Sequence, residues 1–331
     1  MSKIPRRKVV LTAAGLLAVP LASFAQKQTK IWRIGFLTNG TVTSSQGQLD
    51  AFVRGLRELG YTDGKNVILE PRWAEGKLDG LPALVTELLA QKIDLLFAPS
   101  GVAAQAAKKS GTTIPIVFAL APDPVGQGFG QSLAHPGGNM TGLTSTHTEL
   151  SAKRMELLKE AFPRTKRIAA LFFLAPSAAG VAEQLAETER AAKVLGVALV
   201  TEESPRVEDF ERAFASIRTQ RPDALIVIEN PLYFTNRVRL TELAATLRIP
   251  AIYNVSEYVH AGGLMSYGAS YVDLCKRAAA YVVKILNGNV PGDLPIERPT
   301  KFELVVNQKT AKTLGLNIPR SILLRADRVI E

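Results

Sequence analysis

An α/β fold of two lobes, each with a parallel sheet flanked by helices, is the fold class that the sequence predicts. The chain has 331 residues, enough for one large or two medium domains. Short runs rich in β-branched residues alternate with longer segments of helical period, and this alternation runs through the chain twice. Short crossovers of this kind require parallel strands and right-handed connections, so helices cover both faces of each sheet.

The first pass of the alternation ends at residue 119. Its first helix illustrates the pattern, because Leu49, Phe52 and Leu56 fall on one face and Gly60 provides a stop. The expected strands are 31–37, 66–73, 93–98 and 114–119, and the expected helices are 48–59, 81–91 and 102–109.

The second pass begins after residue 145 with a helix. Its apolar stripe consists of Leu150, Leu157, Leu158 and Ala161. The strands expected after this helix are 167–174, 197–201, 224–228 and 251–253, and the helices between them are 179–195, 207–219 and 234–247.

The tail of the chain adds elements that do not simply extend the second lobe. They are a strand at 263–267, a helix at 272–286, a strand at 302–306 and a helix at 308–314. A chain that adds elements after completing one lobe can cross back to the other, so we expect several crossings between the lobes. The predicted first lobe is 27–143 with about 257–298, the second is 146–255 with about 301–331, and a cleft separates them.

The first 25 residues have the pattern of a cleavable signal peptide. Its basic residues are Lys3, Arg6, Arg7 and Lys8. An apolar stretch shorter than the ~20 residues that span a bilayer follows, and cleavage is expected after Ala25. The adjacent Arg6 and Arg7 suggest twin-arginine export, although their neighbours fit that pattern loosely, so the export route stays open. Cleavage lowers the net charge from +10 to +6, a modest excess that does not indicate nucleic-acid binding.

Motifs for catalysis, nucleotide binding and metal binding are absent or incomplete. The segment 60–66 has too few residues between its glycines for a phosphate-binding loop, and Gln131 stands where a dinucleotide fingerprint needs its third glycine. The three histidines are far apart in sequence, and the single Cys275 excludes an intrachain disulfide and a thiolate zinc site. We therefore expect no catalytic residues, no metal and no cofactor; the protein is not expected to be an enzyme.

Several short runs resemble those of a known family. They are FVRGLRELGY at 52–61, WAEG at 73–76, DPVG at 123–126, PGGNMTG at 136–142, YG at 267–268, GDLP at 292–295, VN at 306–307 and LGLNIP at 314–319. Their order and spacing resemble bacterial ABC-transporter substrate-binding proteins, a family with tryptophan- and tyrosine-binding members. The resemblance implies a type 1 periplasmic-binding-protein fold, in which a multi-crossing hinge joins two Rossmann-like lobes. An Asn-Pro-containing segment is usual in the family where this chain has 174–176, which leaves ligand contact by that loop open.

Candidate binding residues follow the strands at their carboxyl ends, where ligands of open parallel sheets bind. In the first lobe they are Thr38, Asn39, Gly40, Ser100, Gly101, Pro122 and Asp123; in the second they are Glu229, Asn230, Tyr253 and Asn254; Tyr267 follows the late strand assigned to the first lobe. Hydroxyls and a helix start can hold a ligand carboxylate, and Asp123 can pair with a ligand ammonium.

Each of these residues also has a structural alternative. Ser100 can cap a helix, and Asp123 before a proline can form a turn. Glu229 can belong to a structural ion pair, and either tyrosine can pack in the core.

These features predict the periplasmic solute-binding component of an ABC importer. Its lobes would close by hinge motion on a small organic solute, with an aromatic or aliphatic amino acid as the candidate. The expected partner is an inner-membrane ABC permease, with no nucleic acid bound, and the protein is expected to be a monomer. A periplasmic receptor for a chemoreceptor or sensor kinase stays open as an alternative, and an exported enzyme is less favoured. A LacI-type regulator is disfavoured because the leader stands where a DNA-binding headpiece would be.

Overall fold

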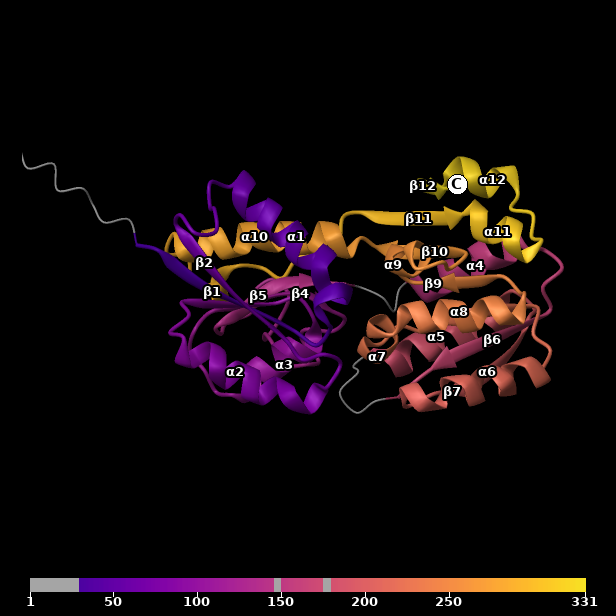
Figure 1. The fold of residues 1–331 in the computed structure, drawn as a ribbon, viewed down its shortest axis with the longest axis horizontal. Helices are drawn as coiled ribbons and strands as arrows, with labels where there is room; N and C mark the ends of the chain where they lie inside the picture. The colour runs from indigo at the N-terminus through magenta and orange to yellow at the C-terminus, as the bar shows by residue number, and fades with distance from the viewer. Residues whose placement is uncertain (1–29, 146–149, 175–179) are drawn as a thin grey trace, which may run out of the picture. The chain divides into compact units, whose positions relative to one another are not determined.

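The computed structural model describes residues 30–145, 150–174 and 180–331 (Figure 1). All the elements below belong to one compact unit, residues 31–331. The predicted signal peptide, residues 1–25, lies outside the described residues, as do 175 and 176 of the predicted loop at 174–176.

The first sheet has five parallel strands in the order β2-β1-β3-β4-β5. The strands are β1 (Trp32–Thr38), β2 (Val67–Trp73), β3 (Leu95–Ala98), β4 (Ile116–Ala121) and β5 (Met140–Thr144), with helices α1 (Val42–Glu58), α2 (Leu81–Ala90) and α3 (Gly101–Lys109). The helix predicted from residue 48 begins at Val42 instead. Its start is fixed by a capping box in which Thr41 and Ser44 each accept a hydrogen bond from the other's backbone N–H.

A late helix, α10 (Tyr271–Leu286), completes the first lobe by packing along α1 (Figure 1). The two backbones approach closely at Gly55, where a Cβ atom would collide with the carbonyl oxygen of Lys276. Phe52 of α1 and Cys275 of α10 lie in the same buried cluster. The chain therefore returns to the first lobe after building most of the second, as the sequence predicts.

The second sheet has seven strands in the order β12-β11-β10-β9-β8-β6-β7. Its strands are β6 (Arg167–Phe172), β7 (Ala198–Glu203), β8 (Ala224–Val227), β9 (Ala251–Tyr253), β10 (Met265–Ala269), β11 (Phe302–Asn307) and β12 (Arg328–Ile330). The helices with it are α4 (Ser151–Ala161), α5 (Val181–Val194), α6 (Phe210–Thr219), α7 (Pro231–Thr235), α8 (Arg237–Leu247), α9 (Ser256–His260), α11 (Gln308–Leu314) and α12 (Arg320–Arg325). All neighbouring strands are parallel except β10 and β11.

The assignment of the strand at 263–267 to the first lobe is wrong. β10 pairs with β9 on one side and with β11 on the other, and Leu264 and Met265 lie in the core of the second lobe. The short helix α9 brings the chain straight back beside β9, so the crossing to the first lobe comes only after β10. The other predicted lobe boundaries stay a prediction.

The helix predicted at 234–247 is interrupted at Asn236, which separates α7 from α8. The Asn236 side-chain amide donates to the carbonyl of Leu232 (2.9 Å), the kind of local bond by which Asn competes with a continuous helix. Among the helices of the described ranges, none is long and apolar enough to cross a membrane.

Candidate functional site

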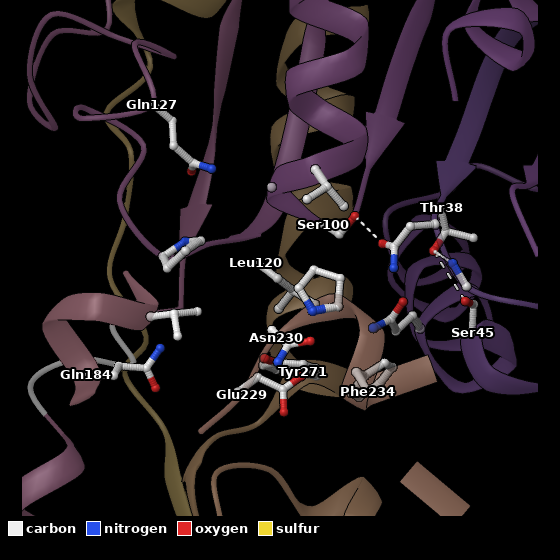
Figure 2. Close-up of a pocket in the computed structure, with 18 residues that line it drawn as sticks. Thr38, Ser45, Ser100, Leu120, Gln127, Gln184, Glu229, Asn230, Phe234 and Tyr271 are labelled. Atoms are coloured by element: carbon white, nitrogen blue, oxygen red, sulfur yellow. Dashed lines mark hydrogen bonds between the residues drawn. The ribbon is translucent and has the colours of Figure 1, made fainter. Parts of the chain in front are cut away.

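A cleft with about 700 Å³ of space, part of it open to solvent, is lined by residues of both lobes (Figure 2). Several helices begin at this cleft: Gly101, Val181 and Tyr271, the first residues of α3, α5 and α10, line it, as does Ser45 in the first turn of α1. Backbone N–H groups without intrahelical partners occur at such helix starts, and they give the cleft a positive potential.

The first-lobe wall is held by hydrogen bonds among its own polar side chains. Ser100 donates to Oδ1 of Asn39 (2.6 Å) while its hydroxyl also caps α3 by accepting from the N–H of Ala103 (3.3 Å). The hydroxyls of Thr38 and Ser45 lie 3.2 Å apart (Figure 2). These bonds fix the side chains, so the wall is preorganised. The structural alternative for Ser100, a helix N-cap, is confirmed, and the same residue lines the cleft.

The second-lobe wall presents Glu229 and Asn230, which follow β8. The side-chain Oδ1 of Asn230 caps α7 by accepting from the N–H of Tyr233 (3.0 Å). Its Nδ2 and the Oε2 of Glu229 are buried and have no hydrogen-bond partner among the described residues. Leaving a buried polar atom unpaired is costly, so both atoms can bind a ligand group strongly.

Burial raises the pKa of Glu229 to about 8, and the neighbouring Glu257 carboxyl adds to this rise. The hydroxyl of Tyr258 and the guanidinium groups of Arg154 and Arg237 oppose it. At neutral pH the carboxyl group is therefore largely protonated, and a cationic ligand group would favour its ionised form.

Arg154 is a buried cation behind this wall, with 2% of its surface exposed. Its Nε donates to the carbonyl of Tyr267 (2.8 Å), and its Nη2 has no hydrogen-bond partner among the described residues. Burial lowers the pKa of Arg154 to about 10, while Tyr271, Glu229 and Tyr267 act in the opposite direction.

Comparison with known proteins assigns the fold and the cleft to a family. The family model described as ABC transporter substrate binding protein matches residues 43–330, most of the chain. The chain belongs to this family. The role named for the family is substrate binding. A solved ABC transporter solute-binding protein from Agrobacterium vitis and an ABC sugar transporter subunit from Rhodobacter sphaeroides share the type 1 periplasmic-binding-protein fold with this chain at 18% and 14% identity.

Three relatives illustrate the similarity. A tyrosine-binding protein from Clostridioides difficile is 27% identical over 265 residues, covering 80% of this chain and 75% of its own. The ABC domain from Streptococcus pneumonia in complex with L-Trp is 25% identical, with a TM-score of 0.82 over 90% of this chain and 99% of its own. The ligand-free, open structure of a substrate-binding protein with adhesive properties from Clostridium difficile is also 25% identical. Its TM-score is 0.67 over 91% of this chain and 99% of its own.

Within this family fold, the structure brings most of the residues predicted from the sequence to one cleft. Those that line it are Thr38, Asn39, Gly40, Ser100, Gly101, Pro122, Glu229 and Asn230. They converge because each follows the carboxyl end of a parallel strand, the geometry used for the prediction. Ligand contact by these residues stays a prediction.

Four predicted residues do not line the cleft. Asp123 is exposed, and its carboxylate accepts from the N–H of Gly126 (2.9 Å), which is its turn-forming alternative. Tyr253 stacks on Tyr258 of α9, with ring centroids 4.8 Å apart, and the neighbouring Asn254 is fully buried. The helix α9 thus covers the end of β9. Tyr267 lies within β10 of the second lobe, where its carbonyl accepts from Arg154.

Other residues reach the cleft from helices, from the interior of β4 or, for Gln127, from a turn, and were not predicted from the sequence. They are Ser45, Gln48, Val102, Leu120, Gln127, Val181, Gln184, Pro231, Phe234 and Tyr271. Gln48 and Gln184 are polar residues on buried helix faces, with 7% and 3% exposed, and such residues in an apolar stripe are a usable signal. Within the described ranges, no group of three or more His, Cys, Asp or Glu side chains is arranged to hold a metal ion.

Proposed function

We propose that this protein is the periplasmic solute-binding component of an ABC importer, which captures an amino acid between its lobes and delivers it to an inner-membrane permease. Membership of the substrate-binding family supports the broad role. The tyrosine-binding and L-Trp-bound relatives support an amino acid as the ligand class. The observation that carries the proposal is the buried carboxyl group of Glu229 facing a cleft where helices begin.

The two ends of an amino acid match the two walls of the cleft. Among its described lining residues, Glu229 is the only charged side chain, so no Lys, Arg or His neutralises a ligand carboxylate. The starts of α1 and α3 supply positive potential and N–H donors for that carboxylate. Glu229 then accepts from the ligand ammonium, and Asn230 Nδ2 donates to a ligand oxygen.

The remaining lining suits an uncharged ligand side chain. Leu120, Val181, Phe234 and Tyr271 provide apolar and aromatic surface, and Gln127 adds an amide at the edge of the cleft (Figure 2). An aromatic or aliphatic amino acid is therefore favoured over an acidic or basic one, since a charged side chain would be desolvated without a partner.

The cellular setting belongs to the same proposal. The predicted signal peptide exports the protein to the periplasm and is cleaved after Ala25. There the protein acts as a monomer without catalytic activity. The sequence motifs support a non-catalytic role, since no complete nucleophile, nucleotide or metal motif is present in the sequence.

Titration calorimetry with matched ligands tests the proposal. L-tyrosine and L-tryptophan are compared with tyramine, which lacks the carboxylate, and with 3-(4-hydroxyphenyl)propionate, which lacks the ammonium. We expect both truncated compounds to bind at least about tenfold more weakly, because each leaves one end of the cleft unpaired. Equal affinity for the compound without an ammonium would refute the role of Glu229, and no binding by a broad panel of amino acids would refute the ligand class.

A variant pair sharpens the test. Glu229→Gln removes the charge with little change in shape, and Asp123→Asn makes the same change at an exposed turn outside the cleft. We expect Glu229→Gln to weaken binding of the amino acid by about tenfold or more and to leave 3-(4-hydroxyphenyl)propionate unaffected. Asp123→Asn should change neither affinity.

A further inference from the structure

A second hollow, with about 1060 Å³ of space that includes open solvent, adjoins the candidate ligand cleft. It is lined by α1 and α10 of the first lobe and by α8, α9 and β11 of the second. Gln48 and Phe234 line both the hollow and the cleft. These two side chains therefore separate the two spaces, and whatever holds them also shapes the ligand cleft.

Arg237, the first residue of α8, contacts Phe234 from the side of the hollow. Its guanidinium carbon lies 4.7 Å from the centroid of the Phe234 ring, a cation–π contact. Its Nη1 donates to the carbonyl of Phe234 (2.9 Å), and its Nη2 donates to the carbonyl of Ser44 (3.3 Å). Arg237 itself does not line the ligand cleft.

The two bonds of this guanidinium reach different lobes. Phe234 belongs to α7 in the second lobe, whereas Ser44 belongs to the first turn of α1 in the first lobe. The planar fork of Arg presents several donors in fixed directions, so one side chain can bridge two carbonyls. Moving the lobes apart requires breaking the bond to Ser44, while the bond to Phe234 lies within one lobe.

The structure that contains this bridge is more similar to a ligand-bound relative than to an open one. The TM-score is 0.82 with the L-Trp complex and 0.67 with the ligand-free, open structure, although both relatives are 25% identical to this chain. The bridge between Arg237 and Ser44 is thus present in an arrangement resembling the ligand-bound form.

We propose that Arg237 is a positioning residue that fastens the second lobe to the first and presses Phe234 against the ligand. It sets the balance between separated and closed lobes and, through that balance, the affinity for ligand. Its effect on ligand affinity rests on the proposed function; its effect on the separation of the lobes does not.

A matched pair of variants on α8 tests this role. Arg237→Gln removes the bridge, and Arg239→Gln removes an equivalent charge that pairs with Glu211 inside the second lobe. Spin labels on Ala83→Cys of α2 and Ala215→Cys of α6, both exposed, report the distance between the lobes by pulsed electron paramagnetic resonance. The one native thiol, Cys275, is fully buried and does not compete for label.

Without ligand, we expect Arg237→Gln to shift the distance distribution toward longer distances and Arg239→Gln to reproduce that of the parent protein. With the amino acid that binds best in the calorimetric panel, the dissociation constant of Arg237→Gln should rise about tenfold, mainly through faster dissociation. Overlapping distributions for all three proteins would overturn the proposal. Because the distance measurement needs no ligand, it tests the bridge even if no amino acid binds.

A second variant covers the case in which Arg237→Gln folds poorly. Arg237→Lys keeps the cation over Phe234 but has a single nitrogen in place of the fork, so it cannot hold both carbonyls in the same geometry. It should show the same shift to longer distances at an unchanged melting temperature. A purely structural role for Arg237 predicts the opposite pattern, a lower melting temperature with an unchanged distance distribution.

Discussion

The carboxyl group of Glu229 is buried, and its Oε2 has no hydrogen-bond partner among the described residues. Burial raises its pKa to about 8 in the folded protein, whereas an exposed glutamate has a pKa near 4.5. The folded state therefore binds this proton more tightly than the unfolded state. Its contribution to stability is greatest at acidic pH and falls as the pH rises from about 4.5 through about 8.

Glu229→Gln should thus raise the melting temperature relative to the parent protein, and by a larger amount at pH 9 than at pH 5. The amide cannot ionise, so it avoids the cost of a buried negative charge at high pH. Thermal melts at pH 5, 7 and 9 measure the effect, and Glu242→Gln, at an exposed position on α8, is the control. A difference that does not change with pH would contradict the raised pKa.

Arg154 shows why part of the site escapes sequence analysis at the scale of single residues. It lies four residues after Leu150 and three before Leu157, within the apolar stripe of α4, so the spacing already marks it as a buried charge. Its neighbours include the carbonyl of Tyr267 in β10 and the carboxyl group of Glu229 after β8, and both follow more than sixty residues later in the chain. Local pattern can identify such a residue but not its partner.

Among the elements, α1 and α10 show how closely two helices from distant parts of the chain are fitted. Gly47 and Gly55 both lie in α1, two turns apart. A Cβ atom at Gly47 meets nothing within 4 Å, whereas one at Gly55 collides with the Lys276 carbonyl oxygen and with Ala279. The same substitution is therefore expected to have opposite effects at the two positions.

Gly47→Ala should stabilise the protein by up to about 1 kcal/mol, because Ala favours an exposed helix interior over Gly. Gly55→Ala should destabilise it by about 1–3 kcal/mol, because the methyl group forces α1 away from α10. Urea denaturation of both variants measures the difference. Stabilisation by Gly55→Ala would show that the two helices pack less closely than described.

The carboxyl ends of strands explain both the success and the failure of prediction at the element scale. Thr38, Ser100 and Asn230 were predictable because each lies at or just after the end of a strand that opens on the cleft. Asn254 follows a strand too, but α9 covers that end, and a five-residue helix has little sequence signal of its own. Phe234 lies in another short helix, α7, which ends at Asn236.

At the scale of the whole molecule, alternation of strands and helices was enough to predict two α/β lobes with several crossings. It could not assign β10 to a lobe, because the chain crosses between the lobes next to this strand. The two-residue period of apolar residues in a strand is the same in either sheet. The pairing of β10 with β9 and with β11 decides the matter, and the spacing of apolar residues does not encode which strands pair.

Cys275 offers a measure of the stability of the whole fold, because burial raises the pKa of its thiol well above the usual range and no solvent reaches it. Labelling by a thiol reagent should be slow in the native protein and fast in urea, since α10 must first leave α1. Saturation with a bound amino acid should slow labelling further, in proportion to the gain in stability. Rapid labelling of the native protein would contradict this burial.

The position of α10 in the chain also fixes the order in which the protein can be completed. Residues 32–144 supply every strand of the first sheet, yet α1 lacks the helix that packs along it at Gly55 until residues 271–286 have been made. During synthesis, the first lobe therefore stays incomplete until most of the second lobe has been made. The first lobe is therefore expected to reach its full stability only after residues 271–286 have joined it.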